Sequence, residues 1–149
     1  MLNPTTVTDR YWLREVLPVD EVNDPGKWLL FFPPDRVDDG WEEIRQMFLD
    51  GELPGVIQVK VSTAKPSNRK SGTDYVVCLH CNHSSDDRGI KDIGRAILER
   101  TGYVEKPYIY YKSDEQTEAG TRATRGRKSV NHLYKLPTVT LYNADFGFV

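Results

Sequence analysis

Hydrophobic residues recur along this chain with two different periods, and each period predicts a different kind of element. In residues 56–63 they alternate strictly with polar residues, so Ile57, Val59 and Val61 are expected on one face of a strand. Shorter apolar runs between turn residues predict further strands over residues 27–32, 75–81, 107–112 and 138–142.

Other segments repeat hydrophobic residues every three or four positions, which is the period of an amphipathic helix. The first such stripe runs from Val37 to Phe48, and Asp38 or Asp39 is expected to cap the start of that helix. Gly51 is expected to end it. The second stripe predicts a helix from about Asp86 to Arg100.

The first 23 residues are expected to form a strap that packs onto a single domain of residues 24–149. The strap contains hydrophobic residues at the spacing of a short helix, namely Trp12, Leu13, Val16 and Leu17. Pro18 is expected to end this helix. The order of the remaining elements predicts an α+β fold, in which a curved, mostly antiparallel sheet carries two long helices on one face.

Acidic and basic side chains nearly balance, at 22 against 20, which gives a formal net charge of -2. This balance excludes a protein that is basic throughout, but it allows a local basic patch. The two signs are segregated, because residues 1–50 contain eleven acids and five bases, whereas residues 119–136 contain no acid. Without a long apolar run or a signal peptide, a cytoplasmic protein with no membrane partner is expected.

A basic segment in the last third of the chain is one candidate for chemistry. It contains Arg122, Arg125, Arg127 and His132 among hydroxyl residues and glycine. Guanidinium groups form paired hydrogen bonds with phosphate, so the segment suits an oxyanion. The alternative is a solvated loop whose charges only maintain solubility.

Polar positions on the predicted strands form a second candidate. They are Lys60 and Ser62 on one strand, His80 on the next, and Tyr110 and Lys112 on the strand after it. If their faces coincide, one side of the sheet presents lysines, an aromatic ring and a histidine, with the arginine segment as a lid. A lysine close to other cations can have a lowered pKa and act as a base. The alternative is that these side chains lie on separate surfaces.

Cys78 and Cys81 are separated by two residues, a spacing that also occurs in zinc sites. On a strand this odd separation places the two side chains on opposite faces, so two buried or half-buried thiols are expected, with no metal and no cofactor. Trp28 and Trp41 are likewise expected in the core, and Trp12 is expected to pack as part of the strap.

Several short segments between Gly26 and Asn143 occur in the same order in a known protein family. The more specific of them are Lys60-Val61-Ser62-Thr63 and Tyr111-Lys112-x-Asp114. On these residues the chain resembles the basophilic-leukaemia-expressed (Bles) protein family. That family is similar in fold to the cap-binding translation initiation factor, so the resemblance implies a curved antiparallel sheet backed by helices. Cap binding in that factor implies two exposed tryptophans around the methylated base, whereas Trp41 is expected to face the core here.

A second resemblance covers only residues 108–114, which are similar to a strand segment of bacterial phosphothreonine lyases. Those enzymes eliminate phosphate with a lysine base, a histidine acid and basic clamps on the phosphate. The resemblance implies Lys60 or Lys112 as the base, His80 or His132 as the acid, and the arginines as the clamp.

The favoured interpretation is a binding domain for a phosphorylated small molecule, a nucleotide, RNA or a phosphopeptide. Its ligand-binding residues would be Lys60, Ser62, Tyr110, Lys112, Arg122, Arg125 and Arg127. Whether the chain is an enzyme stays open, with a phosphate-eliminating lyase as the alternative. A third interpretation is a protein-interaction module, in which the acidic first third or the aromatic strap would contact the partner.

Overall fold

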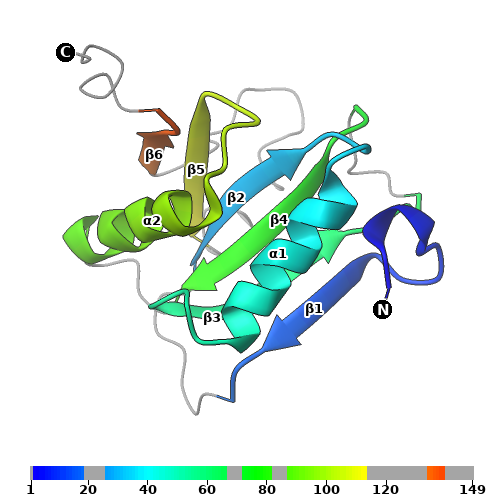
Figure 1. Ribbon diagram of the computed structural model, residues 1–149, viewed down its shortest axis with the longest axis horizontal. Coiled ribbons are helices and arrows are strands. Elements are labelled where there is room, and N and C mark those ends of the chain that lie inside the picture. The colour runs from blue at the N-terminus through cyan, green and yellow to red at the C-terminus, as the bar shows by residue number, and fades with distance from the viewer. Residues whose placement is uncertain (1, 19–25, 67–71, 82–86, 114–133, 140–149) are drawn as a thin grey trace.

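A computed structural model describes residues 2–18, 26–66, 72–81, 87–113 and 134–139 of the chain. Helices and strands of this part are labelled in Figure 1. In chain order they are η1 (Pro4–Thr6), β1 (Trp12–Val16), β2 (Gly26–Phe32), α1 (Val37–Leu49), β3 (Val56–Ser62), β4 (Tyr75–Cys81), α2 (Asp87–Thr101), β5 (Tyr108–Ser113) and β6 (Tyr134–Pro137). None of the described helices is long and apolar enough to cross a membrane.

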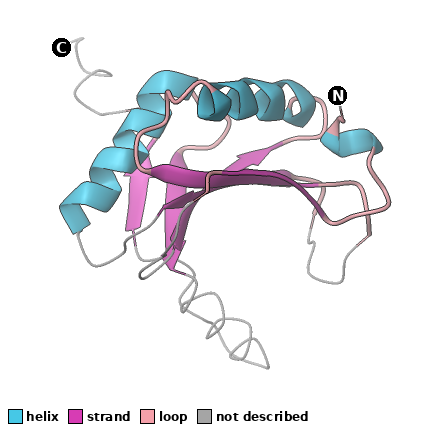
Figure 2. Ribbon diagram, turned by 90° about the horizontal axis from the view of Figure 1, so that it is seen from below, coloured by secondary structure: helices cyan, strands magenta, loops and turns pink. Residues whose placement is uncertain are grey.

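The six described strands form one sheet in the order β1-β3-β4-β2-β5-β6, and every neighbouring pair is antiparallel. Figure 2 shows that the sheet is curved, that α1 and α2 lie on its convex side, and that no described helix lies on the concave side. The predicted α+β fold, with two long helices on one face of a curved antiparallel sheet, is therefore confirmed.

The core lies between the sheet and the two helices, and strand alternation explains which side chains enter it. On β2, Trp28, Leu30 and Phe32 are buried toward the helices, while the residues between them point to the other side. The equivalent inward positions of β4 include Val77 and Leu79, both fully buried. Burial of such side chains contributes roughly 1.5–3 kcal/mol each, which makes this layer the main source of stability.

Helix α1 buries the predicted stripe of Val37, Trp41, Ile44 and Phe48. The expectation that Asp38 or Asp39 caps the helix was wrong, because the helix begins at Val37 and its N-cap is Arg36. The carboxylate of Asp38 instead accepts hydrogen bonds from the backbone N–H and the hydroxyl of Thr5. This contact holds η1 against the first turn of α1, where a negative charge also suits the helix dipole.

The short helix expected near Trp12 and Pro18 was also wrong, since residues 12–16 form the edge strand β1. Leu13 lies opposite Val61 of β3 and is buried. Glu15 occupies the next inward position and accepts a hydrogen bond from Arg45 of α1 at 2.8 Å. A carboxylate on the inward face hides the two-residue period, and this explains why the hydrophobic spacing alone suggested a helix.

The last predicted strand was placed too late in the sequence. Residues 138 and 139 are not in a strand, and residues 140–142 lie outside the described part of the chain. The observed strand β6 ends at Pro137, and its neighbour in the described sheet is β5 alone. Proline is compatible with the end of an edge strand, because its missing N–H removes no interstrand hydrogen bond there.

Ile57 is displaced from its predicted face by an irregularity in the pairing of β3 with β4, between Val56 and Gln58. Val56 is buried in its place, while Ile57 is only half-buried. Beyond this bulge the predicted alternation holds, with Val59 and Val61 toward the helices.

Candidate functional site

The concave side of the sheet, away from α1 and α2, receives one basic side chain from each of the six described strands. These are Arg14, Lys60, His80, Lys27, Lys112 and Lys135, in the order of the strands across the sheet. We call this surface the basic face. In the described strands the only acidic residue is Glu15, which points to the opposite side and pairs with Arg45 of α1.

The pairing register places the basic side chains on two adjacent rows that run across the strands. The first row consists of Arg14, Lys60, Cys78, Leu29, Tyr110 and Lys135. The second row contains His80, Lys27 and Lys112 on three neighbouring strands. Neighbouring strands lie about 4.8 Å apart, so the ammonium groups of Lys27 and Lys112 are close together, with the imidazole of His80 on the next strand.

Lys27 of β2 lies directly opposite Lys112 of β5. Two like charges at such a position repel each other and destabilise the pairing. Partial burial lowers the pKa of Lys112, and the positive charge of Lys27 lowers it further. An anion placed between the two ammonium groups would remove this repulsion, because it would favour the charged form of both lysines.

Aromatic rings support the lysines at both ends of the basic face. The Nζ atom of Lys60 lies 4.0 Å from the ring centroid of Trp12, and that of Lys135 lies 4.6 Å from the ring centroid of Tyr108. The ring of Tyr108 in turn lies 6.5 Å from that of Tyr110. Cation–π contacts of this kind hold the ammonium groups over the face and leave part of each ring accessible.

Five of the residues predicted for a site lie on this one face: Lys60, Ser62, His80, Tyr110 and Lys112. They are not all neighbours, since two strands separate Lys60 from Lys112. Ser62 also has a structural role, because its hydroxyl oxygen accepts a hydrogen bond from the backbone N–H of Val76 at 2.9 Å. The other predicted residues, Arg122, Arg125, Arg127 and His132, lie outside the described residues.

Three basic residues of this face were not predicted: Arg14, Lys27 and Lys135. Lys27 is the first of six residues, 27–32, that were predicted as a strand buried on both faces. This prediction did not take into account that alternate residues of the strand face the concave side. The alternation of Lys27, Leu29 and Phe31 with Trp28 and Leu30 could have indicated this placement.

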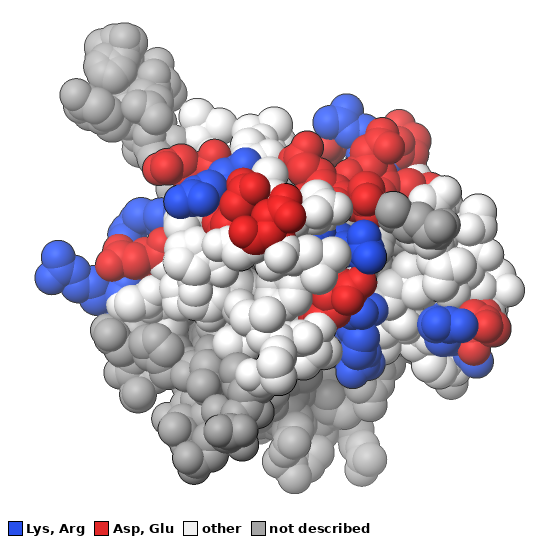
Figure 3. Space-filling view, turned by 60° about the horizontal axis from the view of Figure 1, so that its bottom comes forward, with Lys and Arg blue, Asp and Glu red and all other residues white. Residues whose placement is uncertain are grey.

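The helical side of the molecule differs in charge from the basic face. Figure 3 shows acidic and basic side chains interspersed over the described surface in that view. Several of them form ion pairs, such as Arg45 with Glu15 and Arg36 with Glu105, both at 2.8 Å. Mixed charge of this kind is typical of a solvated surface, so it does not indicate an anion site.

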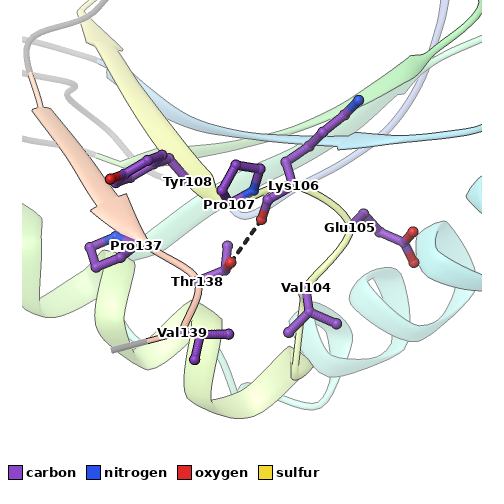
Figure 4. A pocket seen from close by; sticks show the side chains of 8 residues that line it. All are labelled: Val104, Glu105, Lys106, Pro107, Tyr108, Pro137, Thr138 and Val139. Atoms are coloured by element: carbon purple, nitrogen blue, oxygen red, sulfur yellow. Dashed lines mark hydrogen bonds between the residues drawn. The ribbon is translucent and has the colours of Figure 1, made fainter. Parts of the chain in front are cut away.

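A cavity of about 480 Å³ lies between the start of β5 and the end of β6 (Figure 4). Its charged residues point away from it and pair elsewhere, Glu105 with Arg36 and Lys106 with Asp74. The hydroxyl of Thr138 donates to the carbonyl of Lys106 at 2.7 Å. Ligand sites usually combine an apolar wall with a few converging polar groups, and this cavity lacks such groups, so we do not assign it a ligand.

Cys78 and Cys81 are both free and buried, within the buried or half-buried placement that the sequence predicted. Cys81 points toward the helices, and Cys78 points to the basic face beside Lys60. No group of three or more potential metal ligands occurs among the described residues.

Residues 21–120 match the family model of the basophilic leukemia-expressed protein Bles03. The chain belongs to this family. The match includes β2, β3, β4 and β5, which together provide the central four strands of the basic face. A comparison with curated proteins found no sequence match.

Solved structures of eIF4E are similar to this chain in fold. A schistosome eIF4E complexed with m7GpppA and 4E-BP has a TM-score of 0.56 and 19% sequence identity, covering 76% of this chain and 59% of that chain. C. elegans eIF4E-3, in a complex with the 4E-binding protein Mextli and a cap analog, has a TM-score of 0.57 and 13% identity, covering 76% and 57%. At these identities the similarity shows a shared fold, and the resemblance to the initiation factor is confirmed at that level.

Proposed function

We propose that this Bles-family domain binds a phosphate-bearing ligand, such as a nucleotide or an RNA segment, on its basic face. The observation that carries the proposal is the lysine pair at the centre of that face, Lys27 opposite Lys112, with His80 on the next strand. A phosphate group accepts several charge-assisted hydrogen bonds at once, and each is stronger than a neutral one.

Electrostatics on the two sides of the sheet support this choice of ligand. The described strands provide five lysine and arginine side chains and no carboxylate to the basic face. A curved surface with charges of one sign raises the local concentration of a ligand of the opposite sign. The net charge of -2 for the whole chain therefore does not oppose local anion binding.

The eIF4E structures contain cap nucleotides, but the mode of binding proposed here differs from a two-tryptophan sandwich. The chain has three tryptophans, and Trp28 and Trp41 are 0% and 2% exposed. Trp12 alone is accessible on the basic face. A ligand base would therefore stack on Trp12 or on a tyrosine, without a second indole on its other side.

The test is calorimetric titration of the full chain with inorganic phosphate, pyrophosphate and nucleoside triphosphates. Affinity should rise with the number of phosphates and fall with salt. Lys112→Gln should weaken binding by at least about tenfold, because a hydrogen bond to a charged group contributes about 1.5–3 kcal/mol. Lys91→Gln makes the same charge change on α2, at the helical side, and should leave binding unchanged.

Two results would contradict the proposal. One is a chain that binds none of these anions at low salt. The other is an equal loss of affinity in the Lys112→Gln and Lys91→Gln variants, which would indicate only a general effect of net charge.

A phosphate-eliminating lyase is a second candidate, favoured by the position of Lys112 opposite Lys27 and by its lowered pKa, since a lowered pKa brings a lysine closer to the range of a general base. In such a reaction Lys112 would remove the Cα proton of a phosphothreonine, the Cα–Cβ double bond would form, and the Cβ–O bond would break to release phosphate. Mass spectrometry of a phosphothreonine peptide would detect the loss of one phosphoric acid, and unchanged peptides across a broad set would exclude this activity.

A further inference from the structure

Five of the six described strands contribute a lysine or an arginine to the basic face, so positive side chains extend from one edge of the sheet to the other, with His80 of β4 among them. The two edge strands contribute Arg14 and Lys135, and both belong to the same register row. Five interstrand steps of about 4.8 Å give this basic band a length of about 24 Å across the sheet. A mononucleotide or a single phosphate group would contact only a part of it.

Aromatic side chains lie along one side of the basic band. Trp12 is two residues before Arg14, Phe31 is two residues after Leu29, and Tyr108 is two residues before Tyr110. Trp12 lies opposite Ser62, Phe31 opposite Val76 and Tyr108 opposite Pro137, so each ring is one step along its strand from the row of Arg14 and Lys135. We call these three side chains the aromatic row. Tyr108 is 37% exposed, and the other two are half-buried.

A parallel arrangement of cations and aromatic rings fits the two sides of a nucleic acid strand. Phosphates on one side can follow the basic band, while bases on the other side stack on the rings, and each stacked base contributes about 1–3 kcal/mol. A duplex cannot use the aromatic row in this way, because its bases are already stacked on each other.

We infer that the basic face binds a single strand of nucleic acid that crosses the sheet from β1 to β6. The inference rests on the proposed function, since the central phosphates would occupy the Lys27–Lys112 pair. Beyond the proposed function, the ligand is then a strand of several nucleotides, which is bound at both edges of the sheet as well as at the centre.

Oligonucleotide length provides the first test, by fluorescence anisotropy with labelled oligouridylates of increasing length. Affinity should rise with length and level off at no more than about seven nucleotides, because a strand advances at least about 3.4 Å per nucleotide along a band of about 24 Å. The logarithm of affinity should fall with the logarithm of salt concentration with a slope of about -3.5, which is ~0.7 for each of five neutralised phosphates. An RNA duplex with the same number of phosphates should bind more weakly.

Variants at the edges of the sheet provide the second test. Lys135→Gln changes an exposed side chain on β6 and should weaken the binding of an octanucleotide, while a dinucleotide is affected less. Trp12→Ala should weaken the octanucleotide about fivefold or more, and Trp12→Phe should retain most of the affinity because a ring remains. Lys91→Gln serves again as the charge-matched control on the helical side, and circular dichroism verifies folding of each variant.

The outcomes separate the inference from the proposed function. Equal affinity for a dinucleotide and an octanucleotide, together with a loss in Lys112→Gln, would leave a central phosphate site and overturn the crossing strand. Equal binding of the duplex, or full affinity in both edge variants, would overturn it as well. If no phosphate-bearing probe binds at all, the proposed function fails and the inference fails with it.

Discussion

The indole N–H of Trp28 on β2 donates a hydrogen bond to the backbone carbonyl of Ile90 on α2, at 3.1 Å. Both residues are fully buried, so the bond satisfies the one polar atom that the largest side chain of the core brings into it. One helical turn further along α2, Gly94 lies against the same indole, because a Cβ atom at this position would be 2.6 Å from Cζ2 of Trp28. Together the two contacts fix the packing distance between α2 and the sheet.

Gly94→Ala should therefore destabilise the protein, although alanine is the better helix former. The added methyl would also meet Cδ1 of Leu136 at 2.7 Å, so α2 must move away from the sheet. Overpacking of this kind costs about 1–3 kcal/mol, and a chain of this size loses roughly 2–4 °C in melting temperature per kcal/mol. Thermal denaturation measures the effect, with exposed Arg95→Ala on the same helix as the control. A Gly94→Ala variant as stable as the wild type would show that α2 is not held at this distance.

Tyr103→Phe should lower the stability without changing ligand binding. The hydroxyl of Tyr103 donates to the carbonyl of Phe31, near the end of β2 that extends past the pairing with β5. Tyr103 is 5% exposed, so removal of its hydroxyl leaves the carbonyl of Phe31 without this donor in a buried position. The free energy of unfolding should fall by about 1–3 kcal/mol. The ring contact between Tyr103 and Phe32 is preserved in phenylalanine. Chemical denaturation gives the free energy of unfolding, and an unchanged value would contradict the prediction.

Lys112 should make the stability of the ligand-free protein depend on pH. Its pKa is lowered in the folded state from 10.5, chiefly by burial and then by Lys27. Between the lowered pKa and 10.5 the unfolded chain binds more protons, so this residue makes stability rise with pH in that range. Below the lowered pKa both states are protonated, and the destabilisation is fully present.

The Lys112→Gln variant measures this contribution. At neutral pH it should be as stable as the wild type or more stable, by about 0.2–1 kcal/mol. The gain in stability should lie near the lower end of this range, because solvent screens a half-exposed charge. The difference between the two proteins should shrink as the pH rises past 10.5, because above this value the wild-type lysine is uncharged in both states. Urea denaturation across this range checks the sign, and a variant less stable than the wild type at neutral pH would contradict it.

The thiols of Cys78 and Cys81 should react slowly with Ellman's reagent in the folded protein and rapidly in urea. Burial raises the pKa of Cys81 from 9.0 to about 12, and Cys78 is only 2% exposed. Since the thiolate is the reactive form, both burial and the high pKa suppress the reaction. The raised pKa of Cys81 also means that stability falls as the pH rises above 9.0, where only the unfolded thiol ionises. Rapid labelling of the folded protein at mildly alkaline pH would contradict this prediction.

The sequence predicted the helices and the inner strands because each has a period that packing enforces. In α1 the stripe from Val37 to Phe48 faces the sheet, and in β3 the polar residues Lys60 and Ser62 face away from it. Alternation along a strand follows from backbone geometry, so the faces of single strands could be assigned without knowledge of their neighbours.

The order of the strands could not be predicted in the same way, since it depends on contacts between distant parts of the chain. Lys27 and Lys112 are 85 positions apart in the sequence and are neighbours because β5 pairs with β2. The edge strand β1 was missed for a related reason, because its inward Glu15 is compensated by Arg45 of α1, a contact that only the tertiary structure creates.

Lys27 and Trp28 are consecutive residues of β2, one facing the ligand surface and the other the centre of the core. The backbone that carries the central lysine is paired on both sides, with β4 and with β5. A ligand that meets this lysine thus encounters a group whose main chain is already fixed by folding, so little backbone entropy is lost on binding. For the same reason, variants of the Trp28 environment should alter ligand affinity only when they also disturb the fold.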